Sequence, residues 1–205
     1  MKNKVIDTVF FDIGGVLIDI HPDRTLSYLS DCIDIPVDLI KKNFPIEAHN
    51  KYEKGQLSDH EWFLTFKDSM PQPCCLKESD FWTAWLQLLG KEKKTINILK
   101  TLSKDYSIWL LSNTNPMHIH NEIENRYIFP SIIDGAAYSF DLGCRKPDED
   151  IYLKAADLAK TKPIKSIFID DLDININSAT SLGFNALHFQ STEKLIKDLK
   201  ALTIL

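Results

Sequence analysis

The stretch 9–19, which reads VFFDIGGVLID, constrains the fold of this chain more than any other. Three apolar residues lead into a single carboxylate, Asp12, and the glycines Gly14 and Gly15 follow it. A short β-branched and aromatic run that ends in glycines predicts a buried strand followed by a tight turn. A carboxylate at the carboxyl end of such a strand lies where open α/β sheets bind their ligands, although a solvent-facing turn residue would give the same pattern.

Strands and helices are expected to alternate through the second half of the chain. Apolar runs predict further strands at 107–111, 135–138, 167–169 and 186–189. Helices are expected before and between them, around Leu99 and at 115–126, 147–160 and 174–182. This alternation predicts an α/β fold with a parallel sheet and right-handed crossovers.

The stretch between the first two strands is expected to be helical. Apolar residues recur there at helical spacing, and Ser58 with Glu61 forms the pattern of a capping box. Pro71 and Pro73 end one of these helices. We therefore expect an all-helical insert at 18–90, between core segments at 1–17 and 91–205.

Polar residues follow the second predicted strand. Ser112, Asn113 and Thr114 end it, and Asn115-Pro116 is a favoured helix start. The free amides of that helix start, together with the Ser112 hydroxyl, suit a phosphate. An ordinary polar turn between a strand and a helix is the simpler alternative.

Two charged positions stand near later strand and helix ends. Lys146 precedes the acidic start of a helix at 148–150, where a cation does not serve the helix dipole, so it is either a functional or a solvated lysine. Asp170 and Asp171 end the fourth strand. Their carboxylate oxygens suit Mg²⁺, and the alternative is that one of them caps the following helix. Because adjacent strand residues point to opposite faces, we expect only one of this pair to enter a site directly.

Composition excludes several classes of function. The net charge is −5 with a pI of about 5.7, and no cluster of Lys and Arg predicts a nucleic-acid partner. No apolar run reaches the length of a membrane span, and the start of the chain does not resemble a signal peptide. The cysteines show no CxxC spacing and are expected to be reduced thiols, so a cytoplasmic location is expected.

Asp12, Ser112, Lys146 and the pair Asp170-Asp171, in this order, resemble the four motifs of the haloacid dehalogenase superfamily. The resemblance covers the whole chain, and the helical insert is similar to the cap domain of that superfamily. Within it, the chain looks most like the bacterial α-D-glucose-1-phosphate phosphatase group. That narrower resemblance lies in FDIG at 11–14, YEKG at 52–55, LSNTN at 111–115, DLGCRKP at 141–147 and the aspartate pair.

The resemblance implies a Rossmann-like three-layer core with a five-stranded parallel sheet, and a Mg²⁺-dependent phosphatase. The substrate would be a small phosphorylated metabolite, such as a hexose 1-phosphate, and the protein a monomer or homodimer. Asp12 would attack phosphorus to form an aspartyl-phosphate. Mg²⁺ would be held by Asp12, the Gly14 carbonyl and Asp170, with Asp171 as a catalytic partner close to the metal. Lys146, Ser112 and Asn113 would bind the phosphoryl group.

One position departs from the superfamily pattern. Phosphatases of this kind usually carry a second aspartate two residues after the nucleophile as the proton donor, and here that residue is Gly14. Asp19, His21 or His49 could replace it. Two alternatives stay open: a 2-haloacid dehalogenase, and a catalytically weak module that binds a phosphorylated ligand.

Some further side chains are candidates to reach the site or to bind a metal. Arg24, His49 and Trp62 of the insert could reach it, although each could equally be packing or surface. His118 and His120 are expected to be surface histidines, since residues two apart on a helix do not face each other.

Overall fold

A computed structural model describes residues 6–205. The first five residues of the expected core segment 1–17, which were also compared with a signal peptide, lie outside the described residues. One parallel sheet forms the centre of the molecule, in the order β5-β4-β1-β6-β7. Its strands are β1 (Thr8–Phe11), β4 (Ser107–Ser112), β5 (Gly135–Tyr138), β6 (Ser166–Asp170) and β7 (Asn185–His188). The five-stranded parallel sheet expected from the sequence is confirmed.

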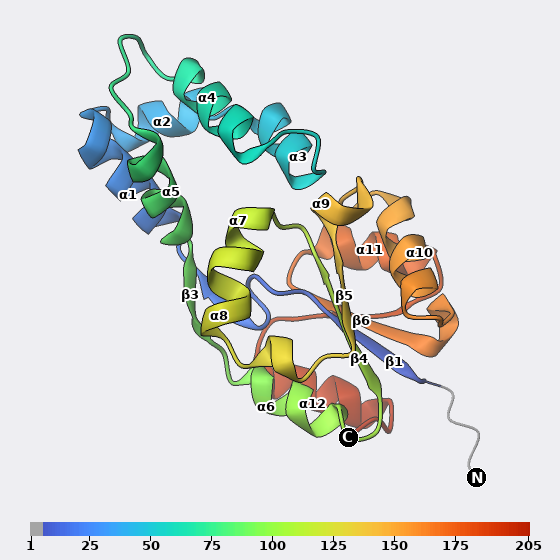
Figure 1. Cartoon of the computed structure of the whole chain (residues 1–205). Coiled ribbons are helices and arrows are strands. Elements are labelled where there is room, and N and C mark those ends of the chain that lie inside the picture. Colours follow the sequence, from blue (N-terminus) through green and yellow to red (C-terminus); the bar gives the residue numbers. More distant parts are fainter. Residues whose placement is uncertain (1–5) are drawn as a thin grey trace.

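Helices cover both faces of this sheet (Figure 1). On one face, Val9 and Phe11 of β1 share a core with α6 (Thr95–Leu102) and α12 (Thr192–Ala201). The continuous helical segment α7 (Pro116–His118), η1 (Ile119–Ile123) and α8 (Glu124–Arg126) packs into the same core. On the other face, Phe10 packs against α10 (Glu149–Leu158) and α11 (Asp173–Ser181). Because both faces of β1 are buried, its sequence is continuously apolar, and the core has the expected three layers.

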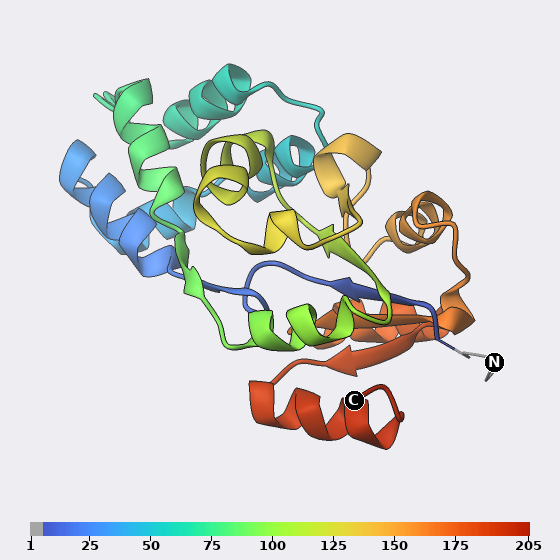
Figure 2. The same cartoon turned by 60° about the horizontal axis from the view of Figure 1, so that its bottom comes forward.

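The insert forms a cap with a hydrophobic core of its own. Its helices are α1 (Pro22–Ile33), α2 (Val37–Asn43), α3 (Ile46–Glu53), α4 (Asp59–Ser69) and α5 (Glu78–Leu86). Trp62 is fully buried at its centre, stacked on Tyr52 at 5.7 Å and edge-on to Phe66 and Trp85. The predicted capping box of Ser58 and Glu61 is present at the start of α4. Figure 2 shows the cap helices grouped together, away from α12.

Two chain segments connect the cap to the core, and they pair with each other. β2 (Ile18–Ile20) runs antiparallel to β3 (Leu89–Glu92) in a separate two-stranded sheet. Residues 18–90 were expected to be all helical, so this pairing was not predicted. A Cβ on Gly90 would lie 2.8 Å from the backbone oxygen of Asp19, so glycine permits the close approach of the two connections.

Several further elements were not predicted. They are η2 (Phe129–Ser131), α9 (Ser139–Leu142), η3 (Pro163–Lys165) and the C-terminal α12. The predicted longer helices are present with ends shifted by a few residues. Within residues 6–205, no helix combines the length and the apolar character that crossing a membrane would require.

Candidate active site

The carboxyl ends of three neighbouring strands bring the predicted site residues together. Asp12 directly follows the central strand β1, while Ser112 and Asp170 are the last residues of β4 and β6 on either side of it. Carboxylate oxygens of Asp12, Asp170 and Asp171 lie within 4.8 Å of one another. The sheet order therefore places side chains that are far apart in the sequence at one edge, as expected for an open α/β sheet.

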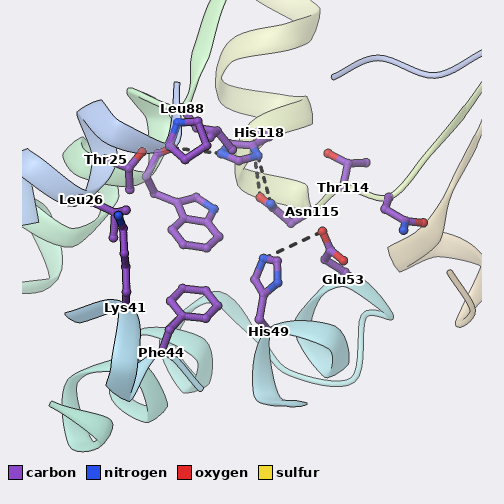
Figure 3. A pocket seen from close by; sticks show the side chains of 13 residues that line it. Thr25, Leu26, Lys41, Phe44, His49, Glu53, Leu88, Thr114, Asn115 and His118 are labelled. Carbon is purple, nitrogen blue, oxygen red and sulfur yellow. Dashed lines mark hydrogen bonds and ion pairs between the residues drawn. The ribbon is translucent and has the colours of Figure 1, made fainter. Parts of the chain in front are cut away.

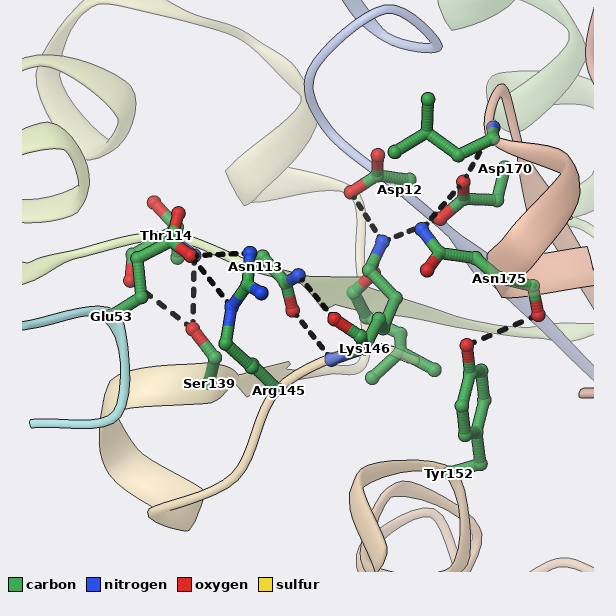
Figure 4. Close-up of polar contacts among 12 residues, drawn as sticks. Asp12, Glu53, Asn113, Thr114, Ser139, Arg145, Lys146, Tyr152, Asp170 and Asn175 are labelled. Atoms are coloured by element: carbon green, nitrogen blue, oxygen red, sulfur yellow. Dashed lines mark hydrogen bonds and ion pairs between the residues drawn. The ribbon is translucent and has the colours of Figure 1, made fainter. Parts of the chain in front are cut away.

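Lys146 is buried and lies between Asp12 and Asp170 (Figure 4). Its Nζ is 2.9 Å from Asp12 Oδ1 and 2.6 Å from Asp170 Oδ2, and it donates a 3.0 Å hydrogen bond to the Leu111 carbonyl. These contacts use all three protons of the ammonium group. Burial alone would lower the pKa of Lys146, but Asp12 and Asp170 raise it, so the side chain is a cation at neutral pH. The solvated surface lysine is thereby excluded.

Asn113 holds the backbone of Lys146 in place. Its side-chain amide donates to the Lys146 carbonyl at 2.9 Å and accepts from the Lys146 N–H at 2.8 Å. These two opposite bonds fix the orientation of the amide. Asn113 therefore acts on the position of Lys146, a role that the sequence did not indicate.

The side chains of the aspartate pair point in different directions: that of Asp170 is turned inward and that of Asp171 faces the cavity. Asp170 is fully buried: Oδ1 accepts from the Leu172 N–H and the Asn175 amide, both at 2.9 Å, and Oδ2 accepts from Lys146. Asp171 is half-buried and lines a cavity of about 290 Å³ together with Asp12. Burial, and then the charge of Asp170, raises the pKa of Asp171.

Three carboxylates outnumber the single lysine at this site. Burial raises the pKa of Asp12 to about 6, and although Lys146 and the Ser112 hydroxyl oppose the rise, Asp170 adds to it. A further cation would relieve this excess of negative charge. Clustered carboxylate oxygens are the donors that Mg²⁺ prefers, so the residues present fit a divalent metal.

The turn after β4 leads into a capped helix, as predicted. The Asn115 side chain accepts a 3.0 Å hydrogen bond from the His118 N–H, and Pro116 is the first helical residue. The Thr114 N–H, however, donates to Ser139 Oγ at 3.0 Å. This amide of the turn is thus engaged by Ser139, a residue that the sequence did not indicate, and is not free for a phosphate.

The cap reaches this site through charged contacts. Glu53, at the end of α3, accepts a 2.8 Å hydrogen bond from Arg145 Nε on Oε2, and Arg145 Nη2 forms an ion pair with the same oxygen at 2.8 Å. Lys54 forms an exposed ion pair with Asp148 at 3.0 Å. Glu53 and Arg145 both line the cavity that contains Asp12 and Asp171. The quoted motifs at 52–55 and 141–147 meet here, but the sequence alone did not pair them.

The remaining candidates from the sequence lie in different places. Asp19 is half-exposed beside Lys93, and neither it nor His21 lines the 290 Å³ cavity within residues 6–205. His49 lines a neighbouring cavity, whereas Trp62 is buried in the cap core and Arg24 lines a separate hollow.

The expectation for the two histidines of α7 and η1 is half wrong. His120 is exposed, but His118 is buried. Its ring stacks on Trp85 at 5.8 Å and bonds the Trp85 carbonyl and the Asn115 side chain. The helix therefore turns His118 toward the cap, which its sequence neighbours did not reveal.

Residues 6–183 match the family model described as haloacid dehalogenase-like hydrolase. The chain belongs to this family. Membership makes the protein a hydrolase.

Two of the related proteins are phosphatases by name. The chain is 25% identical over 187 residues to D-ribitol-5-phosphate phosphatase of Bacteroides thetaiotaomicron, covering 88% of this chain and 90% of that protein. It is 23% identical to a sesquiterpene phosphatase of Aspergillus oryzae, covering 94% of each. The fold is also similar to that of a HAD family enzyme of B. thetaiotaomicron, whose crystal structure is a complex with magnesium and inorganic phosphate. The TM-score is 0.80 at 23% identity, and the match covers 91% of this chain and 96% of that chain.

Proposed function

We propose that this hydrolase is a Mg²⁺-dependent phosphatase, which releases phosphate from a small phosphomonoester through an aspartyl-phosphate on Asp12. The observation that carries the proposal is the buried Lys146, which contacts Asp12 beside a cavity edged by clustered carboxylates. The phosphatase names of the relatives, and the magnesium and phosphate in the related structure, support it.

The reaction runs in two displacements at phosphorus. A carboxylate oxygen of Asp12 forms a bond to phosphorus while the ester P–O bond breaks, and the alkoxide leaves with the bonding electrons and takes a proton from solvent. Water then attacks the same phosphorus and gives up a proton to solvent, the bond between the Asp12 oxygen and phosphorus breaks, and the free carboxylate is regenerated as inorganic phosphate is released. Lys146 orients Asp12 and neutralises charge on the phosphoryl oxygens in both steps, with Ser112 beside them.

The metal would be held by Asp12, the Gly14 carbonyl and Asp171. We assign this role to Asp171 rather than to Asp170, because Lys146, Asn175 and the Leu172 N–H already occupy the oxygens of Asp170. Asp170 would position Lys146 instead. Bound Mg²⁺ supplies positive charge that lets the phosphate and the Asp12 carboxylate approach each other.

None of the three candidate proton donors from the sequence, Asp19, His21 and His49, is suited to protonate the leaving alcohol. Only His49 lines a cavity next to the site. Burial, helped by the nearby Arg145, lowers the pKa of His49 to about 4, so its ring is neutral at pH 7 and a poor proton donor. The alcohol therefore leaves largely as an anion, and acidic alcohols such as the anomeric hydroxyl of a hexose 1-phosphate should leave fastest.

The function is tested by measuring phosphate release from a panel of phosphorylated metabolites and 4-nitrophenyl phosphate, with Mg²⁺ and with EDTA. We expect release with Mg²⁺ only. Asp12→Asn should abolish it while the circular dichroism spectrum of the folded protein stays unchanged, because the amide keeps the shape of the nucleophile but not its charge.

Other outcomes would favour the alternatives. More than a few per cent of residual turnover in Asp12→Asn would exclude the aspartyl-phosphate. Chloride release from 2-chloropropionate that persists in EDTA would indicate a dehalogenase. Phosphate binding without turnover of any ester would indicate a binding module.

A further inference from the structure

The segment that returns from the cap to the core passes close to the turn that follows Asp12. It runs from Leu88, which lines a cavity between cap and core (Figure 3), through β3 to Lys93. The Lys93 N–H donates to the Leu17 carbonyl at 2.8 Å, so Lys93 lies beside the turn of residues 13–17. Its side chain is therefore placed to act on that turn.

The ammonium group of Lys93 holds the backbone of this turn. Its Nζ donates a 2.5 Å hydrogen bond to the Gly15 carbonyl. No backbone N–H within residues 6–205 donates to that carbonyl, so Lys93 is its partner. The same Nζ lies 5.1 Å from the centre of the buried Phe189 ring, which attracts a cation. The carbonyl and the aromatic ring together fix the position of the ammonium group.

Gly15 is the residue of the turn at which such a contact matters most. Its φ of +74° lies in the left-handed region, and glycine has more conformational freedom than any other residue. Its N–H donates to the Ile18 carbonyl at 2.9 Å, and this N–H belongs to the same planar peptide group as the Gly14 carbonyl. The hydrogen bonds to the N–H and the carbonyl of Gly15 therefore set the direction of the Gly14 carbonyl.

Gly15 also borders the proposed metal site. A Cβ at this position would overlap the Asp171 carboxylate, so the turn lies directly against that side chain. Gly14 and Asp171 both line the cavity that contains Asp12. A displacement of Gly15 would therefore move the Gly14 carbonyl and the Asp171 carboxylate relative to each other. Mg²⁺ demands near-ideal octahedral geometry and tolerates such a displacement poorly.

We propose that Lys93 is a positioning residue of the active site: by holding the Gly15 carbonyl, it fixes the turn that presents the Gly14 carbonyl to Mg²⁺ beside Asp171. The inference rests on the proposed function and on the metal ligands assigned there. It adds a residue 78 positions from Gly15 to the groups that determine Mg²⁺ binding.

The alternative is that Lys93 acts on the site by its charge alone. Burial and then the charge of Asp170 raise the pKa of Asp171, and Lys93 is among the cations that oppose this rise. A cation near the site also repels Mg²⁺. Loss of the charge alone would therefore strengthen Mg²⁺ binding, whereas loss of the positioning hydrogen bond would weaken it. The two roles predict opposite effects of Lys93→Met.

Mg²⁺ binding is measured by isothermal titration calorimetry at pH 7, without substrate, in three variants. Lys93→Met removes the ammonium group and keeps an apolar stem against Phe189. Lys93→Arg keeps a cation with N–H donors. Lys91→Met is the control, because the Lys91 side chain is exposed and forms no hydrogen bond or ion pair within residues 6–205.

We expect the Kd of Mg²⁺ to rise on the order of tenfold in Lys93→Met, the effect of one hydrogen bond to a charged group, and to change less than about threefold in the other two variants. A merely structural role would lower Tm of Lys93→Met in EDTA without changing this Kd. Turnover gives a second measurement: the Mg²⁺ concentration for half-maximal phosphate release should rise in Lys93→Met by the same factor as the Kd, and Lys93→Arg should restore it.

The two proposals fail in different ways. If the unaltered protein hydrolyses no ester but Lys93→Met weakens Mg²⁺ binding, the phosphatase function is wrong and the role of Lys93 stands. If esters are hydrolysed but the Kd of Mg²⁺ in Lys93→Met is unchanged or lower, the role of Lys93 is overturned. If the unaltered protein does not bind Mg²⁺, both are wrong. Should Lys93→Met not fold, Lys93→Gln, whose neutral side chain also lacks the ammonium group, is measured in its place and decides in the same way.

Discussion

At the scale of single residues, Gly14 separates this chain from phosphatases that carry an aspartate two positions after the nucleophile. Its backbone lies outside the left-handed region, and a Cβ there would meet only Ile20 Cγ2 at 3.4 Å. Gly15 differs, because its φ is +74° and a Cβ would collide with the Asp171 carboxylate. Glycine is thus required at 15 by its conformation and surroundings, but not at 14.

We predict that Gly14→Asp folds and accelerates the hydrolysis of esters with poor leaving groups. A carboxyl group there can donate the proton that the alcohol lacks, and general acid catalysis typically contributes about 10²–10⁴-fold. The gain should be large for a sugar 6-phosphate, smaller for a sugar 1-phosphate and least for an aryl phosphate. Rates for the three esters are compared in both proteins, with melting curves.

The matched control for this variant is Gly15→Ala, which should lower Tm and activity because it strains the turn and displaces Asp171. Equal rates of the unaltered enzyme on all three esters would show that another residue already donates the proton.

The sequence alone predicted most of the residues at the carboxyl end of the sheet, but not the residues with which they form hydrogen bonds. Asp12 and Lys146 could be found because a single charged residue beside a strand or helix end leaves a local signal. The clamp of Asn113 on Lys146 and the bond between Thr114 and Ser139 join residues at least 25 positions apart. Hydrogen bonds over such distances leave no local pattern, and neither did the division of work between Asp170 and Asp171.

At the scale of elements, the inner strands β1 and β6 were predictable because both of their faces are buried and their sequences are therefore mostly apolar. The pairing of β2 with β3 was not, since these strands are three and four residues long and about seventy positions apart. The cap–core contact of α3 was missed for the same reason, although Glu53 and Arg145 each lie in a quoted motif.

We predict that Glu53→Gln raises KM for phosphate esters about tenfold or more, because the neutral amide weakens the Arg145 contact that holds α3 over the site. Such hydrogen-bonded charges in partly buried places contribute on the order of 1.5–3 kcal/mol. Lys54→Gln is the control: its ion pair with Asp148 is exposed and of little energetic consequence, so KM should stay within about twofold. Steady-state kinetics on one ester decide, and equal KM changes in both variants would exclude a specific role of Glu53.

At the scale of the whole molecule, the fold brings three carboxylates close together, and their mutual repulsion lowers the stability of the folded protein. The cap and the two faces of the sheet each have a separate hydrophobic core, so the charged residues of the site are not part of any of these cores. Burial raises the pKa of Asp171, which means that the folded protein binds that proton more tightly than the unfolded chain does. At pH 7 the ionised carboxylate therefore reduces stability, unless a cation offsets it.

We predict that Mg²⁺ raises Tm of the unaltered protein, and that Asp171→Asn and Asp170→Asn respond in opposite ways. At a Mg²⁺ concentration of about 100 Kd the gain is about 2.7 kcal/mol, or roughly 5–10 °C for a chain of this size. Asp171→Asn should melt higher than the unaltered protein in EDTA, because it removes an unfavourable charge, and should lose most of the Mg²⁺ shift. Asp170→Asn should melt lower in EDTA, since Lys146 loses its buried counter-charge, and should keep a Mg²⁺ shift. Melting curves of the three proteins with EDTA and across a Mg²⁺ titration decide between the two assignments. A Mg²⁺ shift that disappears in Asp170→Asn and persists in Asp171→Asn would return the metal to Asp170.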